Sequence, residues 1–316
     1  SYMNDLVTKS NILHNTLREG PLSVSAYRFL ELGFDKLMSQ IFLILSFILA
    51  AILFRKTEPK KFLAIIKNAR PERMLYYLSP FVMAVVFAYI EKYGQFSWPD
   101  IFGLLSLLLS WLGVWMYSVH ANDQADLNID KISNQQRPLV QKTLTEEDMR
   151  QSGKIFLSLA LLGSWSAGFY PFFMVLVGLS VAYIYSAPPL RLRRVAVLSS
   201  FLISLVILAA TLSGFFFVSF DKQLQIFPIL LAVGIIIMFT LEINFKDMKD
   251  TVGDEAEGVS TLPILLGQNG PRAVGLCLAL SFLLAPIFLS FYTLYIIAIP
   301  GAFVGYRLIT KKPYKE

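Results

Sequence analysis

The chain has 316 residues, of which 55% are hydrophobic and only 16% are charged. An ordinary soluble domain carries about 25% charged residues, so the composition excludes that class and indicates a protein that uses lipid as its outer solvent. A single cysteine excludes a disulfide framework, and two distant histidines argue against a zinc site.

The N-terminal part is predicted to be an appendage, residues 1–73, with one extra transmembrane helix at 37–54. The linker that follows, 55–73, carries seven Lys and Arg residues. We expect part of it to form an amphipathic helix that lies on anionic headgroups. Residues 74–316 are then predicted to be the functional bundle.

Eight further apolar segments are long enough, or nearly so, to cross a bilayer, which takes about 20 helical residues. They lie at 74–90, 101–121, 155–169, 171–187, 195–219, 226–245, 273–289 and 292–309. Two of them are separated at Tyr170-Pro171, because proline breaks a helix interior. The sequence therefore predicts an all-α membrane protein with about nine transmembrane helices.

The basic residues are distributed unevenly over the loops that these nine spans define. One side of the membrane receives 22 of the 28 Lys and Arg residues. The positive-inside rule places that side in the cytoplasm, and this explains the net charge of +6 without a nucleic-acid partner. We expect a multi-pass protein of the cell membrane.

Two acidic loops on this cytoplasmic side hold 11 of the 22 Asp and Glu residues. The loop after span 101–121 reads NDQADLNID, and the loop after span 226–245 reads KDMKDTVGD. Their aspartates superpose with a constant offset of 124 residues, which indicates an internal duplication of a four-helix unit. The pairs are Asp123 and Asp247, Asp126 and Asp250, and Asp130 and Asp254.

Within each loop, the spacing of three and then four residues would put the aspartates on one helical face. Like charges on one face repel unless a cation neutralises them, and Mg²⁺ is typically held by one or two carboxylates together with substrate phosphates. The alternative is solvated charge at two helix ends. The predicted metal ligands are Asn122, Asp126, Asp130, Asp247, Asp250 and Asp254.

Between the two acidic loops, the sequence YSAPPLRLRR joins a rigid proline turn to a basic run. Arginine forks match phosphate oxygens and keep their proton. The alternative is ordinary positive-inside anchoring, which is the role we expect for Arg194. The predicted diphosphate contacts are Arg191 and Arg193, with Asn122, Arg137 and Lys246.

These motifs resemble the UbiA superfamily of intramembrane prenyltransferases over about residues 70–310. The resemblance rests on NDQADLNID with a following RPL, on YSAPPLRLRR, and on KDMKDTVGDEAEGVSTLP. It implies a helical bundle around a large central cavity that opens laterally to lipid, and Mg²⁺ that bridges both Asp motifs to a prenyl diphosphate. The candidate catalytic residues are Asp123, Asp126, Asp250, Arg193 and Tyr185.

The sequence also departs from the family pattern. Arg193 stands where the family has lysine, an extra span precedes the bundle, and the C-terminus is one span short. The first-motif tail is closer to the archaeal lipid and quinone branches than to haem O synthases.

The predicted function is transfer of a polyprenyl group from an allylic diphosphate, with Mg²⁺ assisting the departure of diphosphate. The acceptor stays open among an aromatic acid, a quinol precursor and a glyceryl lipid. A transporter is the alternative, although its ionisable groups would be expected near the bilayer midplane rather than at helix ends. Another intramembrane lipid transferase, a CDP-alcohol phosphotransferase, would require a DG-x-x-AR element that the sequence lacks.

Overall fold

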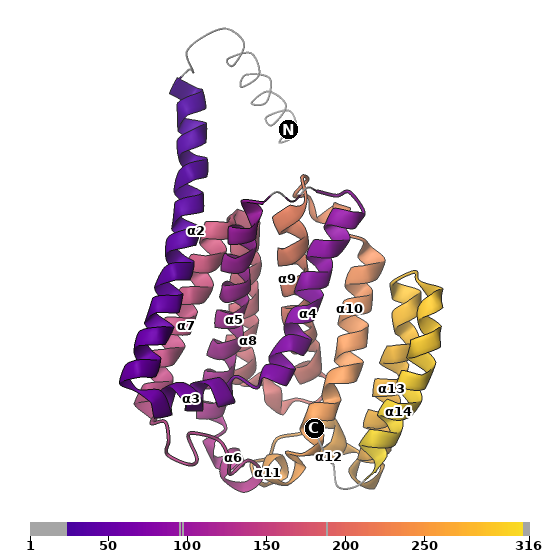
Figure 1. Ribbon diagram of the computed structural model, residues 1–316. Coiled ribbons are helices and arrows are strands. Elements are labelled where there is room, and N and C mark those ends of the chain that lie inside the picture. The colour runs from indigo at the N-terminus through magenta and orange to yellow at the C-terminus, as the bar shows by residue number, and fades with distance from the viewer. Residues whose placement is uncertain (1–23, 95, 97, 188, 312–316) are drawn as a thin grey trace.

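Nine long helices run along a common axis in the computed structural model, which describes residues 24–94, 96, 98–187 and 189–311 (Figure 1). Eight of them are long and apolar enough to cross a membrane, and the ninth, α7, opens with a charged turn before its apolar part. The predicted all-α bundle of about nine transmembrane helices is confirmed. The helices are α2 (Val24–Thr57), α4 (Pro71–Ile90), α5 (Asp100–Ala125), α7 (Glu146–Ala167), α8 (Phe169–Ser186), α9 (Leu198–Val218), α10 (Ile229–Glu242), α13 (Gly270–Phe288) and α14 (Tyr295–Thr310).

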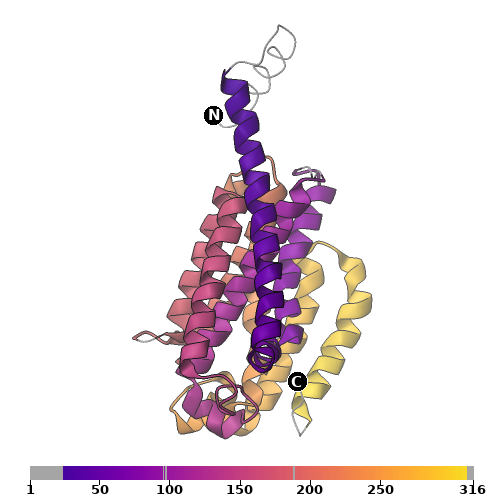
Figure 2. The same cartoon turned by 60° about the vertical axis from the view of Figure 1, so that its left-hand side comes forward.

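The predicted extra span is α2, which is longer at both ends than the apolar run that predicted it. It stands on one flank of the bundle, against α5 and α7, while the α13–α14 hairpin lies on another side (Figures 1 and 2). One buried polar contact fixes its position: Gln40 Nε2 donates to the Ser166 carbonyl at 2.9 Å. The first 23 residues of the predicted appendage lie outside the described residues.

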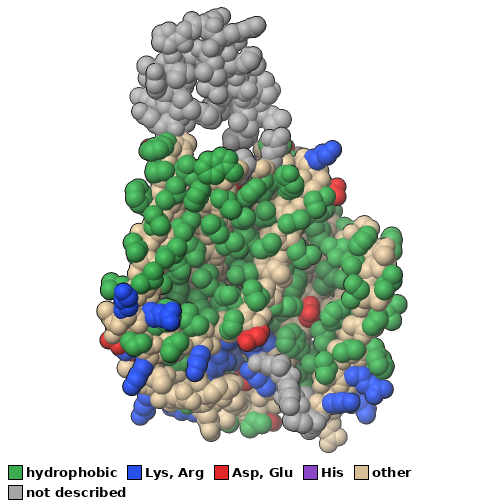
Figure 3. Space-filling model, in the orientation of Figure 1, with side chains coloured by type: hydrophobic (Ala, Val, Ile, Leu, Met, Phe, Trp, Pro, Cys, Tyr) green, Lys and Arg blue, Asp and Glu red, His purple; other side chains and the backbone are tan. Residues whose placement is uncertain are grey.

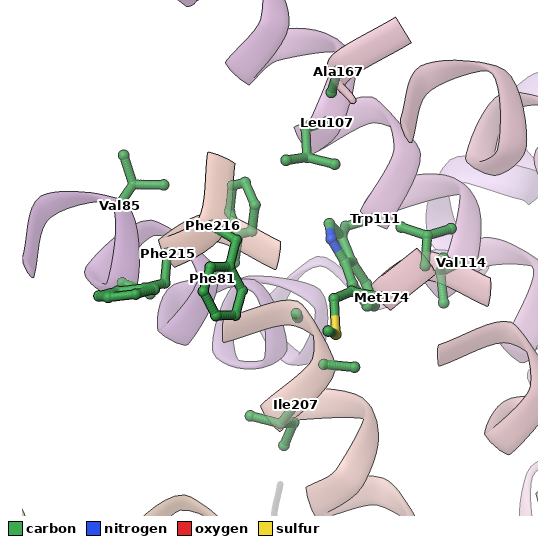
Figure 4. Close-up of a cluster of buried hydrophobic side chains, with 14 of the residues drawn as sticks. Phe81, Val85, Leu107, Trp111, Val114, Ala167, Met174, Ile207, Phe215 and Phe216 are labelled. Atoms are coloured by element: carbon green, nitrogen blue, oxygen red, sulfur yellow. The ribbon is translucent and has the colours of Figure 1, made fainter. Parts of the chain in front are cut away.

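The core of the bundle is aromatic where α4, α5 and α9 meet. Phe81, Trp111, Phe215 and Phe216 are almost fully buried there (Figure 4). Gly214 allows α9 to approach α4 closely, because a Cβ at this position would lie 2.5 Å from the Phe81 carbonyl oxygen. Small residues at such crossings are typical of helix packing in membranes.

The break between α7 and α8 lies at Gly168 and not at Tyr170-Pro171, so the predicted position is wrong. Gly168 has φ 144°, a conformation that favours glycine, whereas Pro171 is the third residue of α8. Proline is tolerated there because the first turn of a helix has no intrahelical partner for its backbone N–H groups.

Short helices cover one end of the bundle: α3 (Pro59–Asn68), α6 (Leu127–Ser133), α11 (Thr251–Ala256) and α12 (Leu262–Leu265). Figure 3 shows hydrophobic side chains over the middle of the molecule and Lys and Arg side chains gathered at the end that carries these helices. This distribution is that of a multi-pass integral membrane protein with one strongly basic face.

Candidate active site

Both aspartate motifs lie at the basic end, and each contains a break between two helices. Asp126 separates α5 from α6, with φ −106° and ψ 13°. Asp250 separates the 3₁₀ helix η3 (Ile243–Met248) from α11, with φ −93° and ψ 0°. The prediction that each trio lies on one continuous helical face is therefore wrong, because short polar side chains favour helix ends over helix interiors. The same break in both motifs agrees with the duplication.

The two short helices of the motifs pack directly on each other. The Gly253 backbone N–H donates to Ser133 Oγ at 3.1 Å. A Cβ on Gly253 would lie 3.0 Å from the Ile129 carbonyl oxygen and 2.4 Å from Ser133 Oγ. Glycine at this position thus brings α11 against α6 and places the two motifs side by side.

A cavity of about 180 Å³ extends from the motifs into the bundle. Its inner walls are apolar and aromatic, and include Trp111, Trp115, Leu202 and Ile207. The outer end is charged. The charged residues that line it, together with Asn122 and Tyr185, are Arg70, Arg73, Asp126, Asp130, Arg137, Arg193, Lys246, Asp247 and Asp250. The structure therefore brings most of the predicted site residues around one cavity. Asp123, Arg191 and Asp254 are not in its lining, but each forms an ion pair with a residue that is.

Arg193 joins the two motifs. Its guanidinium forms an ion pair with Asp126 from the first motif and contacts Asp254 Oδ1 from the second at 3.0 Å. Its Nη1 also donates to Asn122 Oδ1 at 3.3 Å. Arg191 adds a second cation at Asp126 Oδ1, at 2.7 Å. Asp126 and Asp254 are almost fully buried, so these arginines are their counterions.

A second link between the motifs runs through Asn134. Its Nδ2 donates to Asp130 Oδ1 and to Asp250 Oδ1, each at 2.9 Å. Arg137 Nε lies 4.0 Å from Asp130. Burial, followed by the charge of Asp123, raises the pKa of Asp130 to about 6. Burial likewise raises the pKa of Asp254 to about 7, against the opposing effect of Arg193.

Asp123 faces residues that the sequence did not predict for the site. It accepts from Asn68 Nδ2 at 2.9 Å and forms an ion pair with Arg70. The sequence predicts headgroup contacts for part of this linker, but Arg70 and Arg73 line the cavity. The available signal was the Arg70-Pro71 pair. Proline favours the first position of a helix, so the preceding arginine lies at the start of a span, at the end of the bundle that carries the motifs.

Two of the site arginines hold a left-handed backbone conformation, with φ 51° at Arg70 and 41° at Arg191. This conformation is uncommon outside glycine. Both residues place a guanidinium on a buried motif aspartate. The surrounding fold therefore holds these two side chains at some conformational cost, as is frequent at functional sites.

Tyr185 and Lys246 form a third polar group at the cavity. Lys246 Nζ donates to the Tyr185 hydroxyl oxygen at 2.7 Å and lies 3.8 Å from Asp247 Oδ1. By contrast, Arg194 has an exposed side chain, and its backbone carbonyl accepts from the Ser260 N–H at 3.0 Å. The structure thus separates Arg193, at the cavity, from Arg194, at the surface.

Comparisons with known proteins give relatives of low identity. A digeranylgeranylglyceryl phosphate synthase of Sulfolobus acidocaldarius is 26% identical over 207 residues, which cover 64% of this chain and 72% of that protein. Naringenin 8-dimethylallyltransferase 2 of Sophora flavescens is 25% identical over 203 residues, covering 60% of this chain. The chain spans about half the length of this plant relative, 49%.

Solved structures give the same fold. A UbiA homolog from Archaeoglobus fulgidus bound to GPP and Mg²⁺ has a TM-score of 0.62 and 16% identity, over 80% of this chain and 89% of that one. At 16% sequence identity, this similarity shows a shared fold and nothing further. The model of the UbiA prenyltransferase family matches residues 78–316. The match covers most of the chain and includes both aspartate motifs and the arginine loop, so this protein belongs to the UbiA prenyltransferase family.

Proposed function

We propose that this protein is an intramembrane prenyltransferase that moves a polyprenyl group from an allylic diphosphate to an acceptor with an aromatic ring or a glyceryl lipid backbone. One observation carries the proposal. A single cavity has five Lys and Arg residues and four Asp residues at its outer end and an apolar inner part. A prenyl diphosphate has the same division into a charged head and an apolar tail.

The charged end has donors that an anionic ligand would satisfy. The Nε atoms of Arg70 and Arg137 are buried and have no hydrogen-bond partner within the described part of the chain. A buried charged donor without an acceptor costs free energy. Diphosphate oxygens are suitable acceptors, because guanidinium groups bind phosphate through paired N–H donors.

The motif residues fit Mg²⁺ by their chemistry. Hard oxygen donors surround the cavity, and Mg²⁺ typically needs only one or two carboxylates in addition to phosphates. Within the described ranges, no group of three or more His, Cys, Asp or Glu side chains is close enough together to hold a metal ion by itself, so the proposed metal depends on diphosphate oxygens as further ligands. The residues proposed to hold it are Asn122, Asp126, Asp130, Asp247, Asp250 and Asp254.

When bound, Mg²⁺ supplies Lewis-acid stabilisation of the departing diphosphate. Arg193, Arg137 and Lys246 add fixed positive charge where negative charge develops during departure of the diphosphate. The apolar inner walls exclude water, so that the allylic cation reacts with the acceptor and not with a water molecule. The rings of Tyr77 and Trp115 line this region, 5.1 Å apart, and their faces stabilise positive charge.

We further propose that the motifs face the cytoplasm and that the protein lies in the cell membrane. The bias of 22 of 28 basic residues to one side supports this orientation. The division into an appendage at 1–73 and a bundle at 74–316 also stays a prediction, and Asn68 and Arg70, on the appendage side of this boundary, contact Asp123 of the bundle.

The test uses purified protein in lipid nanodiscs with a panel of prenyl diphosphates of increasing length. Aromatic acids, quinol precursors and glyceryl phosphates are offered separately, and products are identified by mass. We expect a prenylated product from one acceptor class, with Mg²⁺-dependent release of diphosphate. Absence of product and of diphosphate release across the whole panel would refute prenyl transfer.

A further inference from the structure

Helix α3 crosses one end of the bundle, where the membrane surface is expected. It is placed between two spanning helices, since α2 ends at Thr57 and α4 begins at Pro71. Figure 1 shows it running across the basic end of the bundle, and in Figure 2 it is seen nearly end-on at the foot of α2. The ten residues of α3 therefore run across this end of the bundle and not away from it.

The inner face of α3 is attached to the bundle. Ala64 and Asn68 are buried. Ala64 belongs to a small apolar cluster with Leu139, Leu144 and Met149, which come from the segment that follows the first motif and from the start of α7. An ion pair between Lys61 and Asp148, at 2.8 Å, adds to this attachment.

The outer face of α3 has no protein partner within the described residues. Leu63 and Ile66, three residues apart and so adjacent on the helix, are 56% and 52% exposed. Lys60 and Lys67 are seven residues apart, so they share a face beside this apolar pair, and both are exposed. Such a surface matches the boundary between headgroups and acyl chains.

The charge around this face selects the kind of lipid. Arg55 and Lys56, at the end of α2, are exposed next to α3, and Glu58 is the acidic residue among them. Each lysine near an anionic surface strengthens binding about fivefold. Ile52 and Leu53 near the end of α2 are also exposed, and α3 adjoins this end of α2, because the rings of Phe54 and Phe62 pack edge to face at 6.0 Å.

The end of α3 reaches the candidate active site. Asn68, in its last turn, donates to Asp123, and Arg70 follows two residues later. Trp115 Nε1, on the cavity wall, donates to the Ala69 carbonyl at 2.7 Å. Any movement of α3 therefore moves the partners of Asp123.

We propose that α3 is a binding surface for anionic lipid headgroups and that an anionic bilayer, by holding α3 in place, supports turnover at the site. The lipid source is the surrounding bilayer leaflet. The effect on turnover depends on the proposed prenyl transfer, whereas the binding itself does not.

The first arm of the test measures α3 directly. Ile66→Cys in a Cys277→Ser background carries a polarity-sensitive fluorophore, in nanodiscs of phosphatidylcholine alone or mixed with phosphatidylglycerol. We expect a blue-shifted emission with phosphatidylglycerol that is lost at about 1 M salt, where the Debye length falls to about 3 Å. Emission that is the same in both lipids would overturn the proposal. This outcome is independent of catalysis.

The second arm measures turnover with a matched pair of triple variants. The test variant removes three charges from the α3 surface: Lys56→Gln, Lys60→Gln and Lys67→Gln. The control removes three exposed charges from the same side of the membrane: Lys142→Gln, Lys154→Gln and Lys311→Gln. None of these residues belongs to the site.

We expect phosphatidylglycerol to raise turnover severalfold in the wild type and in the control, and to have no effect on the test variant. All three proteins should turn over equally in phosphatidylcholine. An equal response of the test variant would overturn the coupling, even where the fluorophore responds. If the wild type shows no turnover in any lipid, this result counts against prenyl transfer. The fluorophore measurement then still decides whether α3 binds anionic lipid.

Discussion

Replacement of Arg193 and, separately, of its neighbour Arg194 by alanine tests the arrangement of the arginine loop. Arg193 is 11% exposed and contacts Asp126 and Asp254, one from each motif. Arg194 is exposed at the surface. We expect Arg193→Ala to abolish most of the activity and Arg194→Ala to preserve it.

The magnitudes follow from burial. Breaking a buried ion pair typically costs about 3–5 kcal/mol of unfolding free energy. The cost of Arg193→Ala should be near the lower end of this range, because Arg191 still neutralises Asp126 and because burial raises the pKa of Asp254 to about 7, so that this carboxyl can take up a proton. Loss of one preorganised charge at a transition state costs about 10²–10³ in rate. For the exposed Arg194, the change in stability should stay within about 0.5 kcal/mol.

The assay is Mg²⁺-dependent diphosphate release at saturating substrates, with thermal unfolding measured on the same samples. Arg193→Lys should fall between wild type and Arg193→Ala, because lysine keeps the charge but lacks the fork that joins two carboxylates. If Arg194→Ala were the more damaging alanine variant, the assignment of the loop would be wrong by one residue. If both alanine variants had small and equal effects, the loop would serve membrane anchoring and not diphosphate binding.

Further expected outcomes concern the motifs and the cavity. Asp126→Asn and Asp250→Asn should each abolish diphosphate release, and Asp126→Asn should also lower the unfolding temperature, because it leaves Arg191 without its carboxylate and Arg193 with Asp254 alone. In the metal-free protein, the raised pKa values of Asp130 and Asp254 mean that folding takes up protons. The free energy of unfolding should therefore fall as pH rises from about 5 to 8, which thermal unfolding at several pH values measures. Addition of Mg²⁺ with prenyl diphosphate should abolish this trend. Trp111→Ala should cost about 3–5 kcal/mol of stability and, by opening the inner wall of the cavity, shift product masses toward longer prenyl chains.

The spans and the two motifs could be predicted from the sequence because each rests on a strong local signal. A long uncharged apolar segment is stable only when it is buried in protein or surrounded by lipid. Two acidic motifs with the same spacing at equivalent spans are hard to explain as solvated loops. The helix break inside each motif could not be predicted in this way. A spacing of three and four residues suits a continuous helix as well as a broken one, and only the packing of α6 on α11 through Gly253 distinguishes them.

The contribution of Asn68 and Arg70 was missed for a different reason. A basic linker between two spans has a sufficient explanation in the positive-inside rule, so apart from the Arg70-Pro71 pair its charges gave no sign that some of them turn inward. Asn68 is uncharged and carries no motif. Its contact with Asp123 joins residues 55 positions apart, and it depends on the course of α3 across the end of the bundle, which composition and periodicity do not fix.

The pairing of acidic and basic groups explains why one cavity holds both. Asp123 is neutralised by Arg70, Asp126 by Arg191 and Arg193, and Asp254 by Arg193. A metal–diphosphate ligand offers cations to the aspartates and anions to the arginines. A buried ion is costly when it has no partner of opposite charge. On the proposed function, binding of the metal–diphosphate ligand exchanges one set of partners for another, so that neither the aspartates nor the arginines are left unpaired. On this proposal, the arginines act as counterions for the motifs before substrate binds and as diphosphate ligands afterwards.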